Sequence, residues 1–180
     1  MIGLKRGTVK LMPHQAQWDK KAQDVIEVLK QILNDTAIDI QHIGSTAISS
    51  IHAKPILDIV VGVRELNDIL PHTEALKQHG IICRGTDVSD QILLVMGDFE
   101  NDTRTHHIHV VQWNGTAWNN YINFRDYLNA HPEKAMLYDA CKQKLAAQFP
   151  NDRIAYTAGK EDLIDGLLKE ARVWRSEHSF

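Results

Sequence analysis

The chain has 180 residues, of which 43% are hydrophobic and 24% are charged, and its formal net charge at pH 7 is −3. This length suits one domain with a sizeable core. It contains no apolar run of about 18 residues that would predict a membrane span, and its small net charge gives no general attraction to nucleic acid or anionic lipid. The N-terminal stretch lacks an apolar segment followed by a small-residue cleavage site, so no secretory signal is expected. Cys83 and Cys141 lie far apart, which indicates free thiols. We therefore expect a cytoplasmic protein with a single domain over residues 1–180.

The hydrophobic pattern predicts an opening helix, a central group of strands and a closing group of helices. Apolar residues at helical spacing predict helices over 14–33 and 66–79, the second ending before Gly80. Strands are expected over 37–43, 54–63, 81–84, 91–97 and 104–113, with a polar hairpin turn at 98–103. Further helices are expected over 118–129, over 131–149 and from about 159 to the end. The pattern indicates an α+β fold in which a mixed sheet of about five strands (about 36–113) carries flanking helices and a C-terminal helical cap (about 115–176).

Two features around the second strand indicate chemistry. Gly44, Ser45 and Thr46 follow the first strand, where backbone N–H groups and hydroxyls can hold a phosphate. Asp58 interrupts an otherwise apolar strand, and burying a carboxylate without a partner is costly. Asp58 is then either a structural residue paired with Lys54 or Arg104, or a ligand for a divalent cation that carries phosphate.

A histidine-rich strand gives the second cluster of candidate residues. Strand alternation places His107 and His109 on one face and His106 on the other. Two imidazoles on one strand face can reach one metal ion or one phosphate. His42 lies near the same edge if the two strands are neighbours, and Arg104 can supply a bidentate anion contact.

Four stretches together carry a family resemblance: HIGSTAISSIHAKPILDIVVGV, RTHHIHVV, NFRDYLNAHPEKAMLYDACKQKLA and YTAGKEDLI. In this order, and over roughly residues 11–168, they resemble the GrpB family (UPF0157) of nucleotidyltransferase-like proteins, which also occurs fused to dephospho-coenzyme A kinase. The resemblance implies a nucleotidyltransferase-like fold in which Gly44 and Ser45 form the turn that holds nucleotide phosphates. It also matches Asp58 to the first metal-binding carboxylate and Lys54 to the family's Lys-Pro pair.

The chain departs from the superfamily pattern at Val60. The superfamily signature is Asp-x-Asp, and Val60 stands where the second acidic residue is expected. Loss of a bridging carboxylate weakens the case for a site with two metal ions. Imidazoles can complete a different site, so the candidate metal ligands are Asp58, His107, His109 and His42, holding Mg, Mn or Zn.

Three functions follow as alternatives. The first is metal-dependent nucleotidyl or phosphoryl transfer to a small acceptor, with Asp58, His107 and His109 as catalytic residues and Gly44, Ser45, Thr46, Lys54 and Arg104 orienting the phosphates. The second is a nucleotide-binding or anion-binding module without turnover, which Val60 favours. The third is a metal-dependent hydrolase that uses the histidine face. Each implies a nucleotide or other phosphorylated small molecule as partner; the sequence does not specify an oligomeric state.

The helical cap offers weaker candidates. Tyr156 can stack on a base, and Lys160 or Arg125 can contact phosphate, but surface charge and helix capping are the simpler interpretation of all three. Trp113 and Trp118 flank a turn into the cap and are interpreted as core anchors.

Overall fold

A five-stranded mixed sheet forms the centre of the computed structural model, which describes residues 1–85 and 90–178. The strands, in the spatial order β2-β3-β7-β5-β4, are β2 (Ala37–Ile43), β3 (Leu57–Val63), β7 (His106–Gln112), β5 (Gln91–Met96) and β4 (Ile82–Gly85). The pair β3–β7 is parallel, and the other three pairs are antiparallel. The inner strands are β3, β7 and β5. Six of the seven residues of β3 and four of the seven of β7 are buried.

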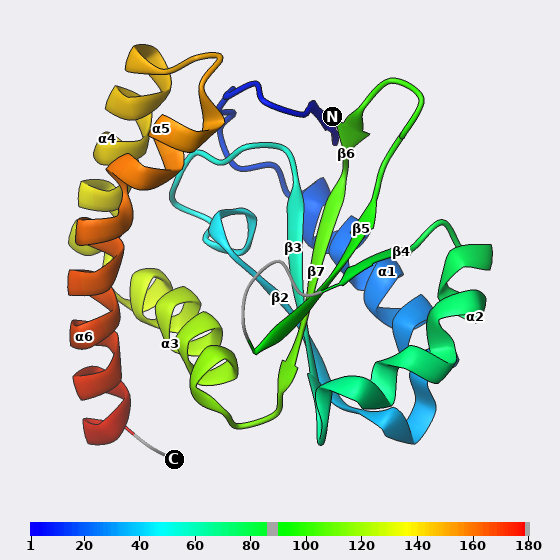
Figure 1. Ribbon diagram of the computed structural model, residues 1–180. Helices are drawn as coiled ribbons and strands as arrows, with labels where there is room; N and C mark the ends of the chain where they lie inside the picture. Colours follow the sequence, from blue (N-terminus) through cyan, green and yellow to red (C-terminus); the bar gives the residue numbers. More distant parts are fainter. Residues whose placement is uncertain (86–89, 179–180) are drawn as a thin grey trace.

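One face of the sheet is covered by α1 (Gln17–Leu33) and α2 (Thr73–Gln78), which appear on the right of Figure 1. The apolar side chains of α1 meet the alternate residues of the strands that point toward it, such as Ile59 and Ile108. Both of these residues are fully buried. This face therefore forms the main hydrophobic core.

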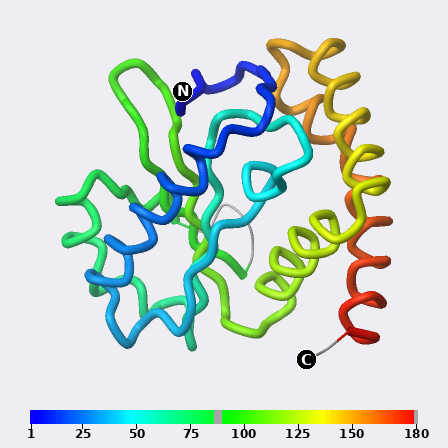
Figure 2. Tube along the Cα trace, turned by 180° about the vertical axis from the view of Figure 1, so that it is seen from behind, coloured from blue at the N-terminus to red at the C-terminus, as the bar shows by residue number. Residues whose placement is uncertain are grey.

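The other side of the sheet carries the helical cap. It consists of α3 (Thr116–Ala130), α4 (Pro132–Gln148), α5 (Arg153–Gly159) and α6 (Glu161–Glu177), and both views show it as a separate layer beside the sheet (Figures 1 and 2). Trp118 of α3 packs on Ile43, Val60 and Val111 of the sheet. The cap helices also form a second core with Ile48 and Ile51 of the segment that joins β2 to β3.

The fold class expected from the sequence is confirmed: the structure has a mixed five-stranded sheet with helices on both sides. The differences are local. The expected helix over 66–79 is a 3₁₀ helix over Leu66–His72, which contains Pro71, followed by α2. A short additional pair, β1 (Leu4–Lys5) with β6 (Thr103–Arg104), was not expected, nor was α5 as a separate helix. No helix in the described ranges is long and apolar enough to cross a membrane.

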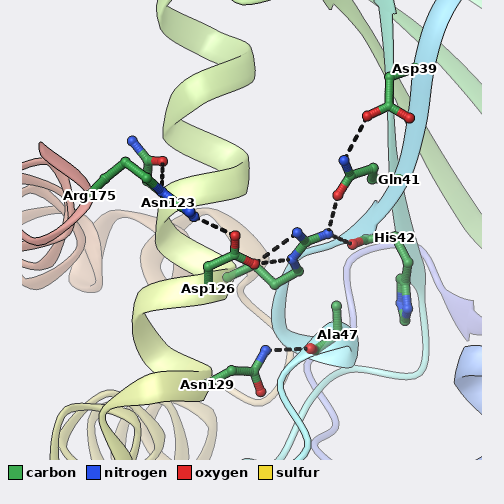
Figure 3. Close-up of polar contacts among 9 residues, drawn as sticks. Asp39, Gln41, His42, Ala47, Asn123, Asp126, Asn129 and Arg175 are labelled. Carbon is green, nitrogen blue, oxygen red and sulfur yellow. Dashed lines mark hydrogen bonds and ion pairs between the residues drawn. The ribbon is translucent and has the colours of Figure 1, made fainter. Parts of the chain in front are cut away.

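A chain of polar contacts fastens the cap to the edge strand β2 (Figure 3). Arg125 of α3 donates to the side chain of Gln41 and to the backbone carbonyl of His42, at 2.7 and 2.9 Å. The same guanidinium pairs with Asp126, which in turn pairs with Arg175 of α6. The guanidinium of Arg125 is therefore already paired with groups that hold the cap against β2, so the suggestion that Arg125 contacts phosphate is not supported.

Candidate functional site

A cavity of about 610 Å³ lies between the sheet and the helical cap. This volume falls within the range of small-molecule sites. Its floor comes from β3 and β7, one side from the turn after β2, and its remaining walls from α3, α4, α5 and α6. The sequence-predicted residues that line it are Gly44, Ser45, Thr46, Lys54, Asp58, His107 and His109, and Tyr156 and Lys160 line it as well.

Asp58 and the two histidines meet on the sheet face that forms the cavity floor. The strand β3 runs parallel to β7 with Asp58 opposite His107, and alternation brings His109 onto the same face. Oδ1 of Asp58 lies 3.2 Å from Nε2 of His109 and 3.7 Å from Nδ1 of His107. Burial alone would raise the pKa of Asp58, but the contacts with His107 and His109 outweigh it and hold that pKa below its usual value. Asp58 therefore remains an ionised carboxylate.

Gly44 brings the backbone of the turn into contact with this carboxylate. Its φ is +72°, in the left-handed region, and a Cβ at this position would lie 2.7 Å from Oδ2 of Asp58. Only glycine meets both conditions without strain. The glycine of the turn is thus required for the turn and Asp58 to lie side by side.

The two hydroxyl residues of the turn have different surroundings. Ser45 lines the cavity and is partly exposed. Thr46 is almost fully buried, and its hydroxyl lies 2.8 Å from Nε2 of His42. Ser45 is therefore the more accessible hydroxyl for a ligand.

Four basic side chains line the cavity near the turn: Lys54, Lys142, Arg153 and Lys160. The ammonium groups of Lys54 and Lys160 lie 5.4 and 4.4 Å from the ring centroid of Tyr156, which is buried. Lys142 of α4 is 1% exposed and donates to the backbone carbonyl of His52. These residues come from the loop before β3, from α4, from α5 and from the turn between α5 and α6, so the cluster exists only in the folded chain.

Burial, with repulsion between neighbouring cations as a smaller contribution, lowers the pKa of two of these lysines. Burial, followed by repulsion from Lys54, lowers the pKa of Lys160 to about 8. Burial lowers the pKa of Lys142 to about 7, with attraction to Asp139 opposing it and repulsion from Lys160 and Lys54 adding to it. Desolvated cations that repel one another gain much from an anionic ligand, because such a ligand relieves both penalties. This end of the cavity favours a polyanion.

Two residues proposed from the sequence do not reach the cavity. His42 lies on the opposite face of the sheet, because β2 pairs with β3 so that Ile43, not His42, stands opposite Asp58. Its Nδ1 lies 3.3 Å from Asp19 of α1. Arg104 belongs to β6 outside the main sheet, and its guanidinium lies 4.9 Å from the ring centroid of Phe99. Neither residue lies beside Asp58 in the cavity. The structure therefore removes His42 from the expected metal ligands and Arg104 from the expected phosphate ligands.

The residues on the cavity floor do not fit a preformed metal centre. Within the described residues there is no group of three or more His, Cys, Asp or Glu side chains placed to hold a metal ion. The ring nitrogens nearest Asp58 are directed at its carboxylate oxygen. Val60, on the same face as Asp58, is fully buried against Ile43, Val111 and Trp118, so this position is apolar and offers no second carboxylate. The two-metal arrangement of the superfamily signature therefore does not fit this chain.

A mixed sheet with a glycine–serine turn beside a strand carboxylate defines a protein of the nucleotidyltransferase-like fold. In agreement, the structure resembles a crystal structure of the Cid1 poly(U) polymerase with MgGTP bound, with a TM-score of 0.53, 14% identity, and coverage of 76% of this chain and 44% of that chain. This likeness establishes the fold alone.

The chain belongs to the GrpB family. The family described as GrpB protein matches residues 8–170. The glutamate-rich protein GrpB of Alkalihalophilus pseudofirmus is 39% identical over 173 residues, covering 94% of this chain and 99% of the relative. A crystal structure of the conserved protein GrpB from Enterococcus faecalis superposes with a TM-score of 0.83 at 30% identity, over 92% of this chain and 99% of that chain. The resemblance inferred from the sequence motifs is confirmed.

Several cavity residues were missed by the sequence interpretation. Lys142 and Arg153 were not identified, and Lys160 was assigned to the surface. The available signal was the spacing of Lys160, Ile164 and Leu168, which are four residues apart and face the cavity from α6. Without knowing which face of α6 meets the sheet, this stripe is indistinguishable from an ordinary amphipathic pattern.

Proposed function

We propose that the chain binds a nucleoside triphosphate in the cavity between the sheet and the cap, with its phosphates at the lysine end. The observation that carries this proposal is that the Gly44–Ser45 turn and four basic side chains line the same cavity. The resemblance to the nucleotidyltransferase superfamily, in which this turn holds nucleotide phosphates, supports it. The cavity also has apolar walls at its other end, from Phe124, Ile164 and Leu168, which suit a nucleoside.

A polyphosphate suits the cation cluster better than a single phosphate. The basic residues approach from different elements, Lys54 from the loop before β3, Lys142 from α4 and Lys160 from the start of α6. Two or three linked phosphates carry several negative charges and can contact all of these groups at once. Asp58 disfavours an anion directly above it, so the phosphates are expected on the side of the cavity toward Tyr156.

Titration calorimetry with tripolyphosphate and with each of the four ribonucleoside triphosphates tests the proposal. Lys160→Met should weaken binding of tripolyphosphate about tenfold or more, because it removes a charge-assisted contact in a partly desolvated site. Lys169→Met is the matched control, since Lys169 lies on the same helix but is exposed outside the cavity. Wild-type protein that binds neither tripolyphosphate nor any nucleotide would overturn the proposal.

Nucleotidyl transfer is a second candidate, favoured by the arrangement of Asp58 and His107. Nδ1 of His107 faces the ionised Asp58 at 3.7 Å, while Nε2 of His107 has no hydrogen-bond partner among the described residues. A carboxylate that orients one ring nitrogen leaves the other able to accept a proton. In this reaction an acceptor hydroxyl bonds to the α-phosphorus and its proton passes to Nε2 of His107. The bond from the α-phosphorus to the bridging oxygen breaks, and pyrophosphate leaves toward the lysines, which stabilise its charge.

Release of pyrophosphate distinguishes the two candidates. Wild-type protein is incubated with each nucleotide and a panel of hydroxyl acceptors, with and without added Mg²⁺. Transfer predicts release that His107→Gln and Asp58→Asn each reduce at least about a hundredfold, while tripolyphosphate binding by His107→Gln is retained. Nucleotide binding without any release of pyrophosphate contradicts transfer and leaves the chain as a binding module.

A further inference from the structure

The cavity extends along α6, from the lysines at the start of the helix to an opposite end further along it. Lys160, Ile164 and Leu168 form one stripe that lines the cavity. At 1.5 Å per residue, Leu168 lies about 12 Å along the helix axis from Lys160. The next residue of this stripe, Arg172, contacts α3 across the far end. A ligand whose phosphates lie at Lys160 therefore has its opposite end near Leu168 and α3.

Asn120 of α3 stands at this far end and lines the cavity. Nε and Nη2 of Arg172 both donate to Oδ1 of Asn120, at 3.1 and 2.9 Å. A guanidinium can only donate, so this contact fixes which end of the amide is oxygen and occupies that oxygen. The Nδ2 group has no hydrogen-bond partner among the described residues. Asn120 therefore offers a ligand only donors.

Gln91 of β5 lines the same cavity and has a similar constraint. Its Oε1 accepts a hydrogen bond of 2.9 Å from the hydroxyl of Tyr121, the neighbour of Asn120 on α3. The Nε2 group of Gln91 is then the part of the amide left for a ligand. Two amides on facing elements, each with its oxygen occupied by a protein donor, line the end of the cavity away from the lysines.

We propose that Asn120, held by Arg172, selects nucleotides whose base carries a carbonyl oxygen. Uracil, guanine and cytosine each present such an acceptor, whereas adenine has no exocyclic oxygen. Adenine accepts hydrogen bonds only at its ring nitrogens, so an N–H group placed to meet an exocyclic oxygen is left unpaired by adenine, which reduces affinity. The proposal rests on the proposed nucleotide binding and adds to it the class of base.

Comparison of the four ribonucleoside triphosphates by titration calorimetry, at fixed salt and Mg²⁺, tests this selection. We expect ATP to bind at least about tenfold more weakly than UTP and GTP, the loss expected for one unpaired donor in a partly desolvated site. Asn120→Asp keeps the shape of the side chain and its pairing with Arg172 but replaces the donor with an acceptor. In this variant the ratio of ATP to UTP affinity should rise at least about tenfold.

Two further variants separate base selection from charge and from folding. Asn119→Asp introduces the same charge at the adjacent residue, which is outside the cavity and bonds Asn114, so the ATP to UTP ratio should stay unchanged. Arg172→Ala frees the Asn120 amide to rotate, so the ratio of ATP to UTP affinity should move toward one. Tripolyphosphate affinity should stay within about twofold of wild type.

The outcomes distinguish this inference from the proposed function. Equal binding of all four nucleotides, or an unchanged ratio in Asn120→Asp, overturns the base selection while nucleotide binding stands. Binding of tripolyphosphate without binding of any nucleotide also overturns it. Absence of binding to tripolyphosphate and to every nucleotide removes the proposed function, and the base selection falls with it.

Discussion

The two faces of the central sheet carry different kinds of side chain, although both are formed by the same strands. On β7, His106 points toward α1 and His107 points into the cavity. Burial lowers the pKa of His106 to about 4, so this histidine is neutral in the dry face. Its neighbour on the opposite face pairs with the ionised Asp58. On β7, the histidine that faces an ionised carboxylate is thus on the cavity side of the sheet.

The comparison shows how the fold separates stability from chemistry. The face toward α1 and α2 holds the largest apolar core, including fully buried Ile59, Val61 and Ile108. The cavity face keeps an apolar patch at Val60 and Val111 under Trp118, and beside it the polar cluster of Asp58, His107 and His109. Strand alternation alone places these two sets one residue apart.

The largest expected effect comes from placing a second carboxylate on the cavity face. Val60→Asp restores the Asp-x-Asp pattern but buries an unpaired carboxylate against Ile43, Val111 and Trp118. We expect it to lower the free energy of unfolding at pH 7 by about 4 kcal/mol, measured by urea unfolding followed by tryptophan fluorescence. Burial raises the pKa of such a carboxyl above its unfolded value, so the native state binds more protons and the deficit shrinks as the pH falls toward 4.

Val60→Asn is the control for this substitution, because it has nearly the same shape and no charge. Its loss of stability should not change between pH 7 and pH 4 relative to wild type. If Val60→Asp instead keeps wild-type stability at pH 7, the surroundings of residue 60 accommodate a charge. The description of Val60 as part of an apolar patch on the cavity face would then be wrong.

The second effect concerns the dry face. Ile59→Ala removes a fully buried side chain next to Asp58 in the chain but on the opposite side of the sheet. We expect a loss of about 3 kcal/mol in the free energy of unfolding, from lost apolar burial and the remaining cavity. Affinity for tripolyphosphate should stay within about twofold of wild type under conditions where the variant is folded. A larger change in affinity would show that the two faces are coupled.

The third prediction concerns the stability cost of the lysine end. Lys142 has a pKa of about 7 in the folded chain, against an ordinary value of 10.5. Between pH 7 and pH 10.5 the unfolded chain binds more protons than the folded chain, so wild-type stability rises with pH. The full cost of burying the Lys142 charge is therefore present below pH 7. Lys142→Met should therefore raise the free energy of unfolding at pH 6 by about 2 kcal/mol, with little difference from wild type near pH 10.5.

The same variant should weaken tripolyphosphate binding about tenfold, because it removes a cation from the cluster. Lys144→Met, on the same helix but exposed and outside the cavity, should leave both stability and affinity near wild type. Urea unfolding at pH 6 and near pH 10.5, combined with calorimetry, gives both quantities. A destabilised Lys142→Met at pH 6 would contradict the prediction that burying this charge is costly.

The sheet and its order of elements could be predicted from the sequence because the signals are local. Alternation in 104–113 and the apolar run in 54–63 mark strands without knowledge of their partners. The same alternation assigned His107 and His109 to one face, and the structure brings both to Asp58. The fold class followed from these elements and from the family motifs.

The lysine cluster and the amide pair could not be predicted in this way, because they depend on how separate helices pack. Lys142 and Lys160 are 18 positions apart on different helices, and nothing in either helix indicates that they share a cavity. His42 was misplaced for a related reason. Nearness to Gly44 in the chain suggested a shared site, but the register of β2 on β3 decides the face.

The smallest expected effect tests the removal of Arg104 from the expected phosphate ligands. Its guanidinium is largely buried, stacks on Phe99, and lies 3.5 Å from Asp102. Its backbone pairs with Leu4 of β1. Arg104→Ala should therefore cost about 1 kcal/mol of stability, from the lost cation–π contact and packing, and tripolyphosphate affinity should stay within about twofold of wild type. A tenfold loss of affinity would place Arg104 among the phosphate ligands, and the ligand would then have to extend beyond the cavity to the β1–β6 pair.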